Sequence, residues 1–498
     1  MPGDNFFEFL DARFVALGEK PALRSPAGEI LLSYADLRAG AARYANALAM
    51  LGVVPGDRVS VQTAKSLECV MLYLGVVKAG AVYHPLNPGY TADEVAYFLG
   101  DAEPQVVVCD PARQAETRRS ADSFRISAVL NLDAKGQGSM ADFARRMDAR
   151  HTTVARGPDD LAGLLYTSGT TGRSKGAMIS HGNIASNAKA LVKLWAMTAE
   201  DRLIHALPVY HVHGLFVALH TAFLAGAQLL WFENFDRDGV LSALPHATML
   251  MGVPTFYTRL LNSERLTPDL CAAMRLFISG SAPLLAETHR SFAARTGHVI
   301  LERYGMTETG MIASNPYHGA RVPGTVGFAL PGVEVRIGGD PGVIEVKGPN
   351  VFKGYWHRPE MTREEFRADG FFITGDTGSI DPDGRITISG RAKDLIISGG
   401  FNVYPTEIEE RIEAIPGIAE AAVIGVPHPD FGEAVVAAVT ASAPLPPEAE
   451  MIGMLAERLA KFKLPKRIFV VDALPRNAMG KVQKAELRAR YASTFTPA

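Results

Sequence analysis

A glycine-rich loop from Tyr166 to Gly176 carries a dense set of anion-binding groups. It reads Tyr-Thr-Ser-Gly-Thr-Thr-Gly-Arg-Ser-Lys-Gly and follows an apolar run, 161–165, that favours a strand. Glycines let the backbone approach an anion and turn its N–H groups inward, while hydroxyls and a lysine add donors and charge. Because Lys175 precedes Gly176, this is not a Walker A motif, in which Gly-Lys-Ser/Thr run in that order. The loop therefore predicts a phosphate cradle, with the binding residues Thr167, Ser168, Gly169, Thr170, Thr171 and Lys175.

Composition excludes several other classes of function. The 498 residues are 47% hydrophobic and 21% charged, and the net charge of −3 gives no basic footprint for nucleic acid. The N-terminus lacks the basic region of a signal peptide. Residues 203–232 contain no Asp, Glu, Lys or Arg, but they include several histidines, which are costly in lipid. We predict buried strand and helix there, no membrane partner, and, from three widely spaced cysteines, a cytoplasmic protein without a disulfide framework.

The order of elements along the chain predicts an α/β fold. Over the first hundred residues, predicted strands alternate with predicted helices, which favours a mostly parallel sheet covered by helices. Between about 322 and 390, short β-rich runs alternate with Gly, Pro and Asp turns, and α/β texture returns after 391. We therefore predict a large N-terminal domain of helix-covered, mostly parallel sheets with a β-barrel-like subdomain, residues 1–391. A small α+β C-terminal domain, residues 392–498, follows it.

The expected strands are 58–62, 82–86, 105–109, 161–165, 333–337, 343–347, 371–374, 385–389, 421–426, 434–440 and 467–471. Helices are expected over 66–80, 91–101 and 448–461 and from Pro405 onward, and Ser33 with Asp36 predicts a capping box at the start of another.

Four further motifs follow the loop in the sequence. They are Tyr304-Gly-Met-Thr-Glu308, Thr374-Gly-Asp376, Gly390-Arg-Ala-Lys-Asp394 and Pro475-Arg-Asn-Ala-Met-Gly-Lys481. Together with the loop, and in this order, they resemble the signature of the adenylate-forming superfamily of acyl-CoA synthetases, adenylation domains and luciferases. The resemblance covers essentially the whole chain. It implies an AMP-binding N-terminal domain and a mobile C-terminal domain that carries a catalytic lysine.

The implied chemistry is the attack of a carboxylate on the α-phosphorus of ATP, after which pyrophosphate leaves. Attacker and target are both anions, so positive charge and oriented donors are the main requirement. The resemblance implies Lys481, Glu308 and Thr167 as catalytic residues, with Mg²⁺ on Glu308 and Thr167. It implies a two-state enzyme whose small domain turns at a hinge at Lys393. A pantetheine tunnel near Gly399 and Gly400 would then admit coenzyme A. The further nucleotide contacts that it implies are Tyr304, Gly305, Met306, Thr307, Asp376, Arg391 and Lys481.

The acyl acceptor is expected to be free coenzyme A, because the chain stops soon after Lys481 and no carrier domain follows. No carrier-protein partner is therefore expected. Lys481 on a mobile domain is also a candidate for a lysine acetyltransferase, since acetylation removes the charge that its role requires. By type alone, Lys481 could equally be a solvated surface lysine, and Asp376 a turn residue after Gly375.

An arginine beside the adenine motif indicates the carboxylate substrate. Arg303 directly precedes Tyr304, and leaving such a charge unpaired in a pocket costs about 3–5 kcal/mol. A second carboxylate on the substrate removes that cost and suits the arginine fork. Arg259, Ser281 and His211 are the other predicted substrate residues. Arg259, Ser281 and Arg303 match a motif set that resembles the malonyl-CoA synthetases, which implies malonate and also methylmalonate as substrates.

Alternatives exist for the residues and for the function. Arg303 could pair with Glu302 or another acid, and Arg259 could lie on a helix surface. The pair His211 and His213 lacks further ligands at metal-binding spacing. The enzyme could instead activate a medium-chain or aryl monocarboxylate, for which a pocket arginine is useless. A non-catalytic nucleotide-binding protein is the third alternative, and the presence of Glu308 and Lys481 argues against it.

Overall fold

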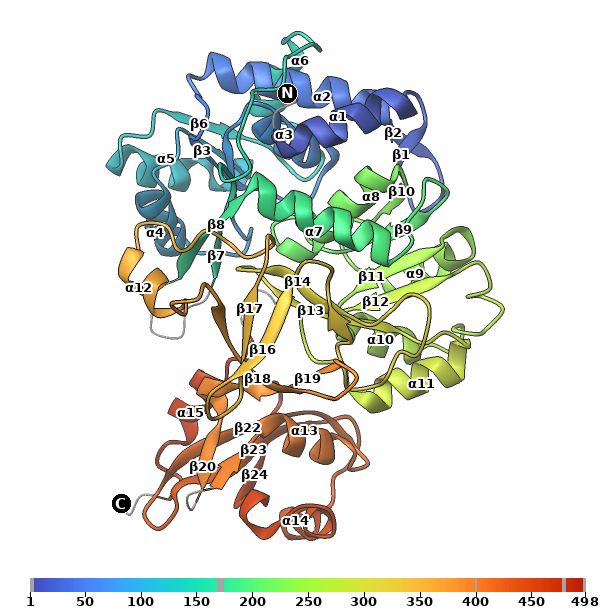
Figure 1. Ribbon diagram of the computed structural model, residues 1–498, viewed down its shortest axis with the longest axis vertical. Helices are drawn as coiled ribbons and strands as arrows, with labels where there is room; N and C mark the ends of the chain where they lie inside the picture. The colour runs from blue at the N-terminus through green and yellow to red at the C-terminus, as the bar shows by residue number, and fades with distance from the viewer. Residues whose placement is uncertain (1–3, 168–173, 399–400, 477–480, 496–498) are drawn as a thin grey trace. The chain divides into compact units, whose positions relative to one another are not determined.

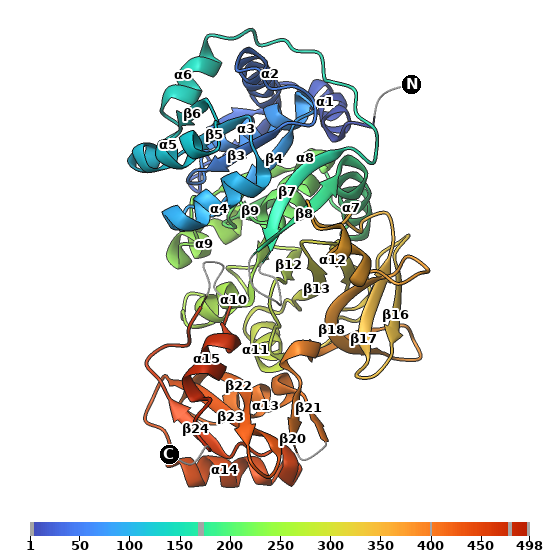
Figure 2. The same ribbon diagram turned by 90° about the vertical axis from the view of Figure 1, so that its left-hand side faces the viewer.

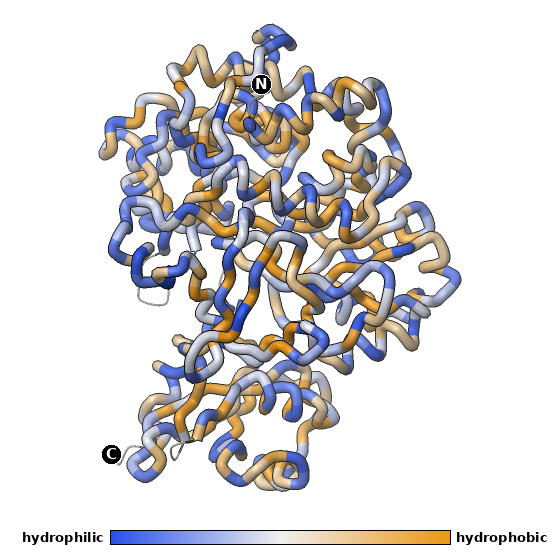
Figure 3. The backbone as a smooth tube through the Cα atoms, in the orientation of Figure 1, coloured by the Kyte–Doolittle hydropathy of each residue, from blue (hydrophilic) through white to orange (hydrophobic). Residues whose placement is uncertain are grey.

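The computed structural model describes residues 4–167, 174–398, 401–476 and 481–495 (Figure 1). The chain forms two compact units, of which the first comprises 1–335 and 346–372 and the second 336–345 and 373–498. Hydrophobic residues run through the inner strands of each unit, and hydrophilic residues follow the outer loops and helices (Figure 3).

Six strands of the first unit form one sheet, in the order β6-β5-β3-β4-β7-β8. They are β3 Arg58–Gln62, β4 Val82–Pro85, β5 Val106–Cys109, β6 Ala128–Asn131, β7 Leu161–Thr167 and β8 Lys175–Ser180. Neighbouring strands are parallel except β7 and β8. The carboxyl ends of β3, β4 and β7 therefore share one edge, and this is the edge where open α/β sheets bind ligands. Thr167 is the last residue of β7.

The second sheet of the first unit has the order β15-β14-β13-β12-β11-β9-β10-β1-β2. Its strands are β1 Pro21–Arg24, β2 Ile30–Ser33, β9 Arg202–His205, β10 Gln228–Trp231, β11 Met249–Gly252, β12 Leu276–Ser279, β13 Leu301–Met306, β14 Gly310–Ser314 and β15 Phe328–Ala329. The strands from β1 to β13 in this order are parallel, while β2, β14 and β15 pair antiparallel. Residues that follow β9, β12 and β13 consequently meet at one edge.

Helices cover these sheets. They are α1 Phe6–Leu17, α2 Tyr34–Met50, α3 Leu67–Lys78, α4 Ala92–Ala102, α5 Gln114–Ser123, α6 Ser139–Arg145, α7 His181–Leu194, α8 His220–Ala225, α9 Arg237–Ala243, α10 Pro254–Leu261, α11 Ala286–Thr296 and α12 Pro359–Glu364. Helices α1, α2 and α3 pack together, and α4 lies beside α5 (Figures 1 and 2). The predicted capping box of Ser33 and Asp36 begins α2. The apolar stretch 203–232 forms buried strand and helix, as predicted, and no described helix is long and apolar enough to cross a membrane.

The second unit contains the other two sheets. One sheet consists of the strands β16 Glu334–Gly338, β17 Val343–Lys347, β18 Phe372–Ile380 and β19 Ile386–Arg391. The second unit begins at 336 within β16 and is interrupted after 345 within β17, so the outer residues of these two strands belong to the first unit. The other contains β20 Ile396–Ser398, β21 Phe401–Val403, β22 Ile418–His428, β23 Gly432–Ala441 and β24 Arg467–Val470. Its helices are α13 Pro405–Glu413, α14 Glu448–Ala456 and α15 Lys484–Tyr491.

Both faces of the sheet that contains β23 are covered. Side chains alternate along a strand, so Val435 and Val439 pack into one hydrophobic cluster and Val436 and Ala438 into another. Residues of α13 and α14 complete the first cluster, and Leu487 of α15 lies in the second. A strand that is apolar on both faces is thus explained by helices on both sides.

The predicted α/β class with a small α+β C-terminal part is confirmed. The helix expected over 448–461 ends earlier, at Ala456, because the chain becomes extended at Ala460 and again at Leu464, which precedes Pro465. The predicted boundary between two domains at 391/392 assumes that the C-terminal domain moves about Lys393, and it stays a prediction. The compact second unit also includes 336–345 and 373–391.

Three buried histidines of the first unit are held in the neutral form. Burial lowers the pKa of His84 to about 3, of His181 to about 4 and of His220 to about 3, with nearby arginines adding to the effect for the first two. Their ring nitrogens contact the Ser60 hydroxyl at 2.8 Å, the Phe6 N–H at 3.0 Å and the Tyr73 hydroxyl at 2.6 Å, respectively.

These histidines predict that the first unit loses stability in mild acid. An unfolded histidine binds a proton below about pH 6.5, whereas these rings stay neutral when folded, so the unfolded state binds more protons as pH falls. Each then costs about 2 kcal/mol between pH 7 and pH 5. Urea unfolding at the two pH values, followed by tryptophan fluorescence, measures the difference. Equal free energies of unfolding at both would contradict the neutral assignment.

Candidate active site

Thr167 and Glu308 meet at the carboxyl ends of two different sheets. Thr167 ends β7, and Glu308 lies in the turn between β13 and β14. The Thr167 hydroxyl donates to Glu308 Oε1 at 2.9 Å, and Glu308 is 5% exposed. A buried carboxylate in a fixed orientation is the hard oxygen ligand that Mg²⁺ prefers. In the described part of the chain, no group of three or more His, Cys, Asp or Glu could form a metal cage. The donor set thus fits a metal shared with a phosphate.

The phosphate loop connects two paired strands. Thr167 is the cross-strand partner of Lys175 on the antiparallel strands β7 and β8, so the sheet fixes both ends of the loop. Lys175 is buried, and its Nζ donates to Glu365 Oε1 at 2.8 Å. The predicted binding residues Ser168, Gly169, Thr170 and Thr171, and also the tunnel residues Gly399 and Gly400, lie outside the described residues.

The adenine motif ends β13. Tyr304, Met306 and Thr307 are half-buried there, and the pairing of β13 with β14 is irregular between Tyr304 and Gly305. A Cβ at Gly305 would lie 2.1 Å from the Gly310 carbonyl oxygen, so only glycine allows this close strand approach. The motif therefore forms a tight turn that carries Glu308.

Arg303 is a buried cation that pairs with no carboxylate among the described residues. It is 3% exposed, and within the described ranges its Nε and Nη2 have no hydrogen-bond partner. Burial lowers its pKa to about 10, so it still carries its charge at neutral pH. A Cβ at Gly280 would lie 2.4 Å from its guanidinium carbon, so the glycine backbone packs directly against it. The alternative in which Arg303 pairs with Glu302 is not found among the described contacts.

Ser281 and His213 lie near this guanidinium, and His211 contacts His213. Ser281 Oγ lies 3.2 Å from His213 Nδ1, and the His213 N–H donates to His211 Nδ1 at 3.4 Å. Ser281 has a φ of 73°, which non-glycine residues rarely adopt and which is common at functional sites. Burial lowers the pKa of His213, and the charge of Arg303 lowers it further. The structure thus unites Arg303, Ser281 and His211 and adds His213.

Arg259 does not join that buried cluster. It is exposed on α10, with its guanidinium carbon 5.9 Å from the centre of the Phe235 ring. Of the two predicted arginines, Arg303 alone is buried. Arg259 therefore lies on a helix surface, as in the alternative given for it in the sequence analysis.

The remaining predicted residues belong to the second unit. Asp376 and Arg391 are cross-strand partners on β18 and β19, with Arg391 Nε 2.6 Å from Asp376 Oδ1. Lys393 lies in the short turn Ala392–Asp394, and burial lowers its pKa. Lys481 is exposed and precedes α15. Two of the predicted nucleotide residues are thus already paired with each other.

Comparison with known proteins identifies the family. Residues 10–356 match the family model of the AMP-binding enzymes, and 407–481 match the model of the AMP-binding enzyme C-terminal domain. The chain belongs to the AMP-binding enzymes. A malonate–CoA ligase of Arabidopsis thaliana is 35% identical over 477 residues, which are 88% of this chain and 78% of that protein. A long-chain-fatty-acid–CoA ligase of Mycobacterium tuberculosis is also 35% identical, over 94% of this chain and 95% of its own length.

Solved structures agree with this membership. ATP-bound MatB from Rhodopseudomonas palustris is 53% identical, with a TM-score of 0.95 over 99% of this chain and 100% of that one. The prediction of an AMP-forming acid–thiol ligase is confirmed, and so are its cofactors, since the AMP-binding CoA ligases use ATP, Mg²⁺ and coenzyme A.

Two residues that the sequence did not single out contact predicted nucleotide-binding and metal-binding residues of this AMP-binding enzyme. The Tyr355 hydroxyl lies 2.8 Å from Glu365 Oε2 and 3.3 Å from Glu308 Oε1. Glu365 also pairs with Lys175, so Tyr355, Glu365, Glu308 and Lys175 form one network of side chains. In the sequence, Tyr355 is typical of a core aromatic and Glu365 of a solvated helix end, so their types gave no signal.

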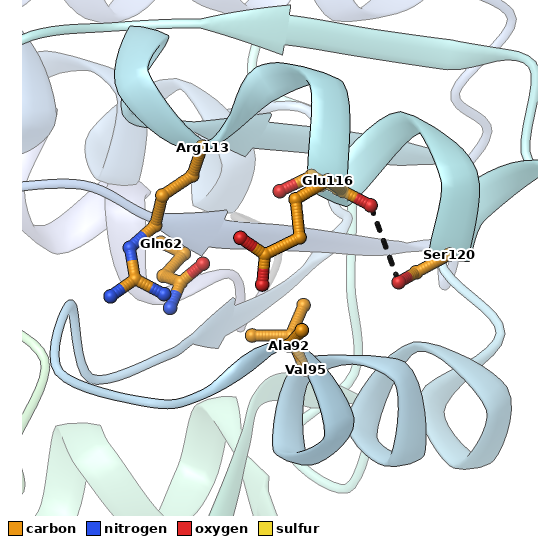
Figure 4. Close-up of a pocket in the computed structure, with 7 residues that line it drawn as sticks. Gln62, Ala92, Val95, Arg113, Glu116 and Ser120 are labelled. Atoms are coloured by element: carbon orange, nitrogen blue, oxygen red, sulfur yellow. Dashed lines mark hydrogen bonds between the residues drawn. The ribbon is translucent and has the colours of Figure 1, made fainter.

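A separate crevice between α4 and α5 is not this site. Gln62, Arg113 and Glu116 line it, and its cavity volume of about 0 Å³ leaves no room for a water molecule, far below the roughly 300–1,000 Å³ of ligand pockets (Figure 4). The candidate site therefore remains the region of Thr167, Glu308 and Arg303.

Proposed function

We propose that the chain activates malonate: malonate, ATP and coenzyme A give malonyl-CoA, AMP and pyrophosphate. The observation that carries this proposal is the buried guanidinium of Arg303, whose Nε and Nη2 have no partner among the described residues. Two curated relatives, one named for malonate and one for long-chain fatty acids, are each 35% identical and do not decide between these substrates, whereas the 53% identity with MatB supports malonate. A fatty acid would leave the charge buried and unpaired, at a cost of about 3–5 kcal/mol, whereas the second carboxylate of malonate would pair with it.

The proposed mechanism assigns the two carboxylates of malonate to different tasks. One pairs with Arg303 and is oriented by Ser281 and His211, which holds the other in place to attack the α-phosphorus of ATP. Lys175 and the loop residues bind the phosphates, and Tyr304 stacks on adenine while Asp376 binds the ribose. Bound Mg²⁺, held by Glu308 with Thr167, would neutralise phosphate charge. Lys481 stabilises the charge that develops between carboxylate and α-phosphate.

The second half-reaction transfers the malonyl group to coenzyme A. We propose that the C-terminal part of the chain, residues 392–498, turns about Lys393, so that Lys481 leaves and the thiol enters near Gly399 and Gly400. Hinges need only a few residues to absorb the backbone change.

Partners and location follow from the same chemistry. Small molecules are the partners of a CoA ligase, and no carrier protein is needed. The described free thiols Cys69, Cys109 and Cys271 are buried and suit a reducing compartment, for which we propose the cytoplasm. Lys481 is exposed and therefore accessible to a lysine acetyltransferase, which would switch off adenylation.

A substrate panel tests this function. Malonate is expected to give the highest kcat/KM for CoA-dependent AMP release among malonate, methylmalonate, succinate, acetate and octanoate. Methylmalonate should follow within roughly 10- to 200-fold, because one added methyl group changes binding by about 1–3 kcal/mol. AMP and pyrophosphate should form in equal amounts. A preference for octanoate or another monocarboxylate would replace malonate as the substrate.

A further inference from the structure

Lys65 is a buried lysine for which the proposed mechanism has no use. It lies just after β3, in the core of the first unit. Its Nζ is 2.8 Å from His205 Nδ1, 2.8 Å from the His205 carbonyl oxygen and 2.6 Å from the Phe232 carbonyl oxygen. The ammonium also lies 4.0 Å from the centre of the Trp231 ring. Lys65 thus connects the end of β3 with the ends of β9 and β10.

Counting hydrogens shows that Lys65 and His205 together carry one positive charge. His205 Nε2 lies 3.0 Å from the Gly214 carbonyl oxygen, and a carbonyl only accepts. The three carbonyl contacts need three hydrogens, and the contact between Nζ and Nδ1 needs a fourth. An ammonium with a neutral imidazole supplies four, and so does an amine with an imidazolium. Burial lowers the pKa of both groups, while the charge of Glu233 raises that of Lys65.

His205 links Lys65 to the chain segment that carries His211 and His213. Through Gly214 it holds the backbone beside His213, and the Leu215 N–H donates to the His211 carbonyl oxygen at 2.9 Å. A Cβ at Gly214 would lie 2.0 Å from the Pro208 carbonyl oxygen, so the segment is folded tightly on itself. A displacement at His205 therefore moves the two histidines rather than being absorbed between them.

We propose that Lys65 is a positioning residue for substrate selection, which acts through His205 on the segment of His211 and His213. This inference rests on the proposed function, because it assigns those histidines to the acyl pocket. The charge that Lys65 and His205 share also adds to that of Arg303, which favours a dianionic substrate over a monoanion. Fixing a pocket wall matters because a displacement of about 1 Å can cost roughly 100-fold in rate.

Replacing Lys65→Met tests the proposal against a matched control. Lys78 is a second buried lysine of the first unit, which contacts the Thr153 hydroxyl at 3.0 Å and lies 4.4 Å from the centre of the Phe7 ring. K65M is expected to raise the KM for malonate at least about 10-fold and to lower the kcat/KM ratio of malonate over acetate. ATP affinity, measured by calorimetry, should stay within about twofold. K78M should leave the KM for malonate and the ATP affinity unchanged.

A second variant keeps the test decisive if K65M does not fold. His205→Asn retains an acceptor for Lys65 but is too short to reach Gly214, so it breaks the link alone and should also raise the KM for malonate. A folded K65M or H205N with the wild-type KM overturns the proposal. If K65M and K78M raise the KM for malonate equally, or if K65M weakens ATP binding as much as malonate binding, Lys65 has only a structural role. Either result also overturns the proposal. If the wild-type enzyme rejects malonate, the proposed function fails, and the KM of its preferred acid is scored in the same way.

Discussion

Lys481→Ala is expected to stop formation of the acyl-adenylate while ATP still binds. The reaction joins two anions, and a donor directed at developing charge is worth about 100- to 1,000-fold in rate. Malonate-dependent pyrophosphate release should therefore fall by at least about 100-fold. ATP affinity by calorimetry should change little, because the loop, Lys175 and Glu308 all belong to the first unit. Unchanged pyrophosphate release would remove Lys481 from the mechanism.

Lys484 supplies a matched control for Lys481. It lies three residues further along, and its Nζ is 2.6 Å from Glu409 Oε1 within the second unit. Lys484→Ala should lower stability slightly but retain pyrophosphate release. The second half-reaction separates the roles further. Given preformed malonyl-adenylate, the Lys481 variant should still transfer malonate to coenzyme A, since that step does not need the lysine.

The sequence predicted the elements that carry the site because motif and element coincide. Strand β3 was placed at its observed bounds, 58–62, and the predicted strand 161–165 ends two residues before the end of β7, which continues to Thr167. The helix expected over 448–461 was too long, since Pro465 restricts only the residue before it and the turn at Ala460 has no such signal. The pairing order of the strands was not predictable, because it depends on contacts between distant segments.

The two arginines show how far residue type can identify a site. Phe256, Tyr257 and Leu260 are the buried residues of α10, so the helical period already places Arg259 on the opposite, exposed face. No period places Arg303, because Leu301, Glu302 and Arg303 are all buried on β13. Lys65 had no signal at all, since Thr-Ala-Lys-Ser is typical of a loop before a helix. Its role depends on the ends of β9 and β10, more than 100 residues away.

Arg303→Met is expected to abolish selection for malonate without unfolding the protein. Methionine has a similar length and no charge, and the guanidinium leaves two nitrogens without partners among the described residues. Removing a buried unpaired charge should maintain or raise the melting temperature. Losing one partner of a buried charge pair costs about 2–5 kcal/mol, so kcat/KM for malonate should fall roughly 30- to 4,000-fold. Acetate turnover should be retained or improved.

Arg259→Met separates the buried arginine from the exposed one. Arg259 lies on the surface of α10, so its replacement should leave stability unchanged and reduce kcat/KM for malonate far less than R303M. An equal loss in both variants would mean that Arg259 reaches the substrate in another conformation of the enzyme. A loss in R259M alone would transfer the specificity to the surface arginine. If R303M lost stability as well as malonate, its guanidinium would be satisfied in the free enzyme, and the argument for a second carboxylate would fail. Kinetics and melting curves on the same two variants therefore decide whether the buried charge exists for the substrate or for the fold.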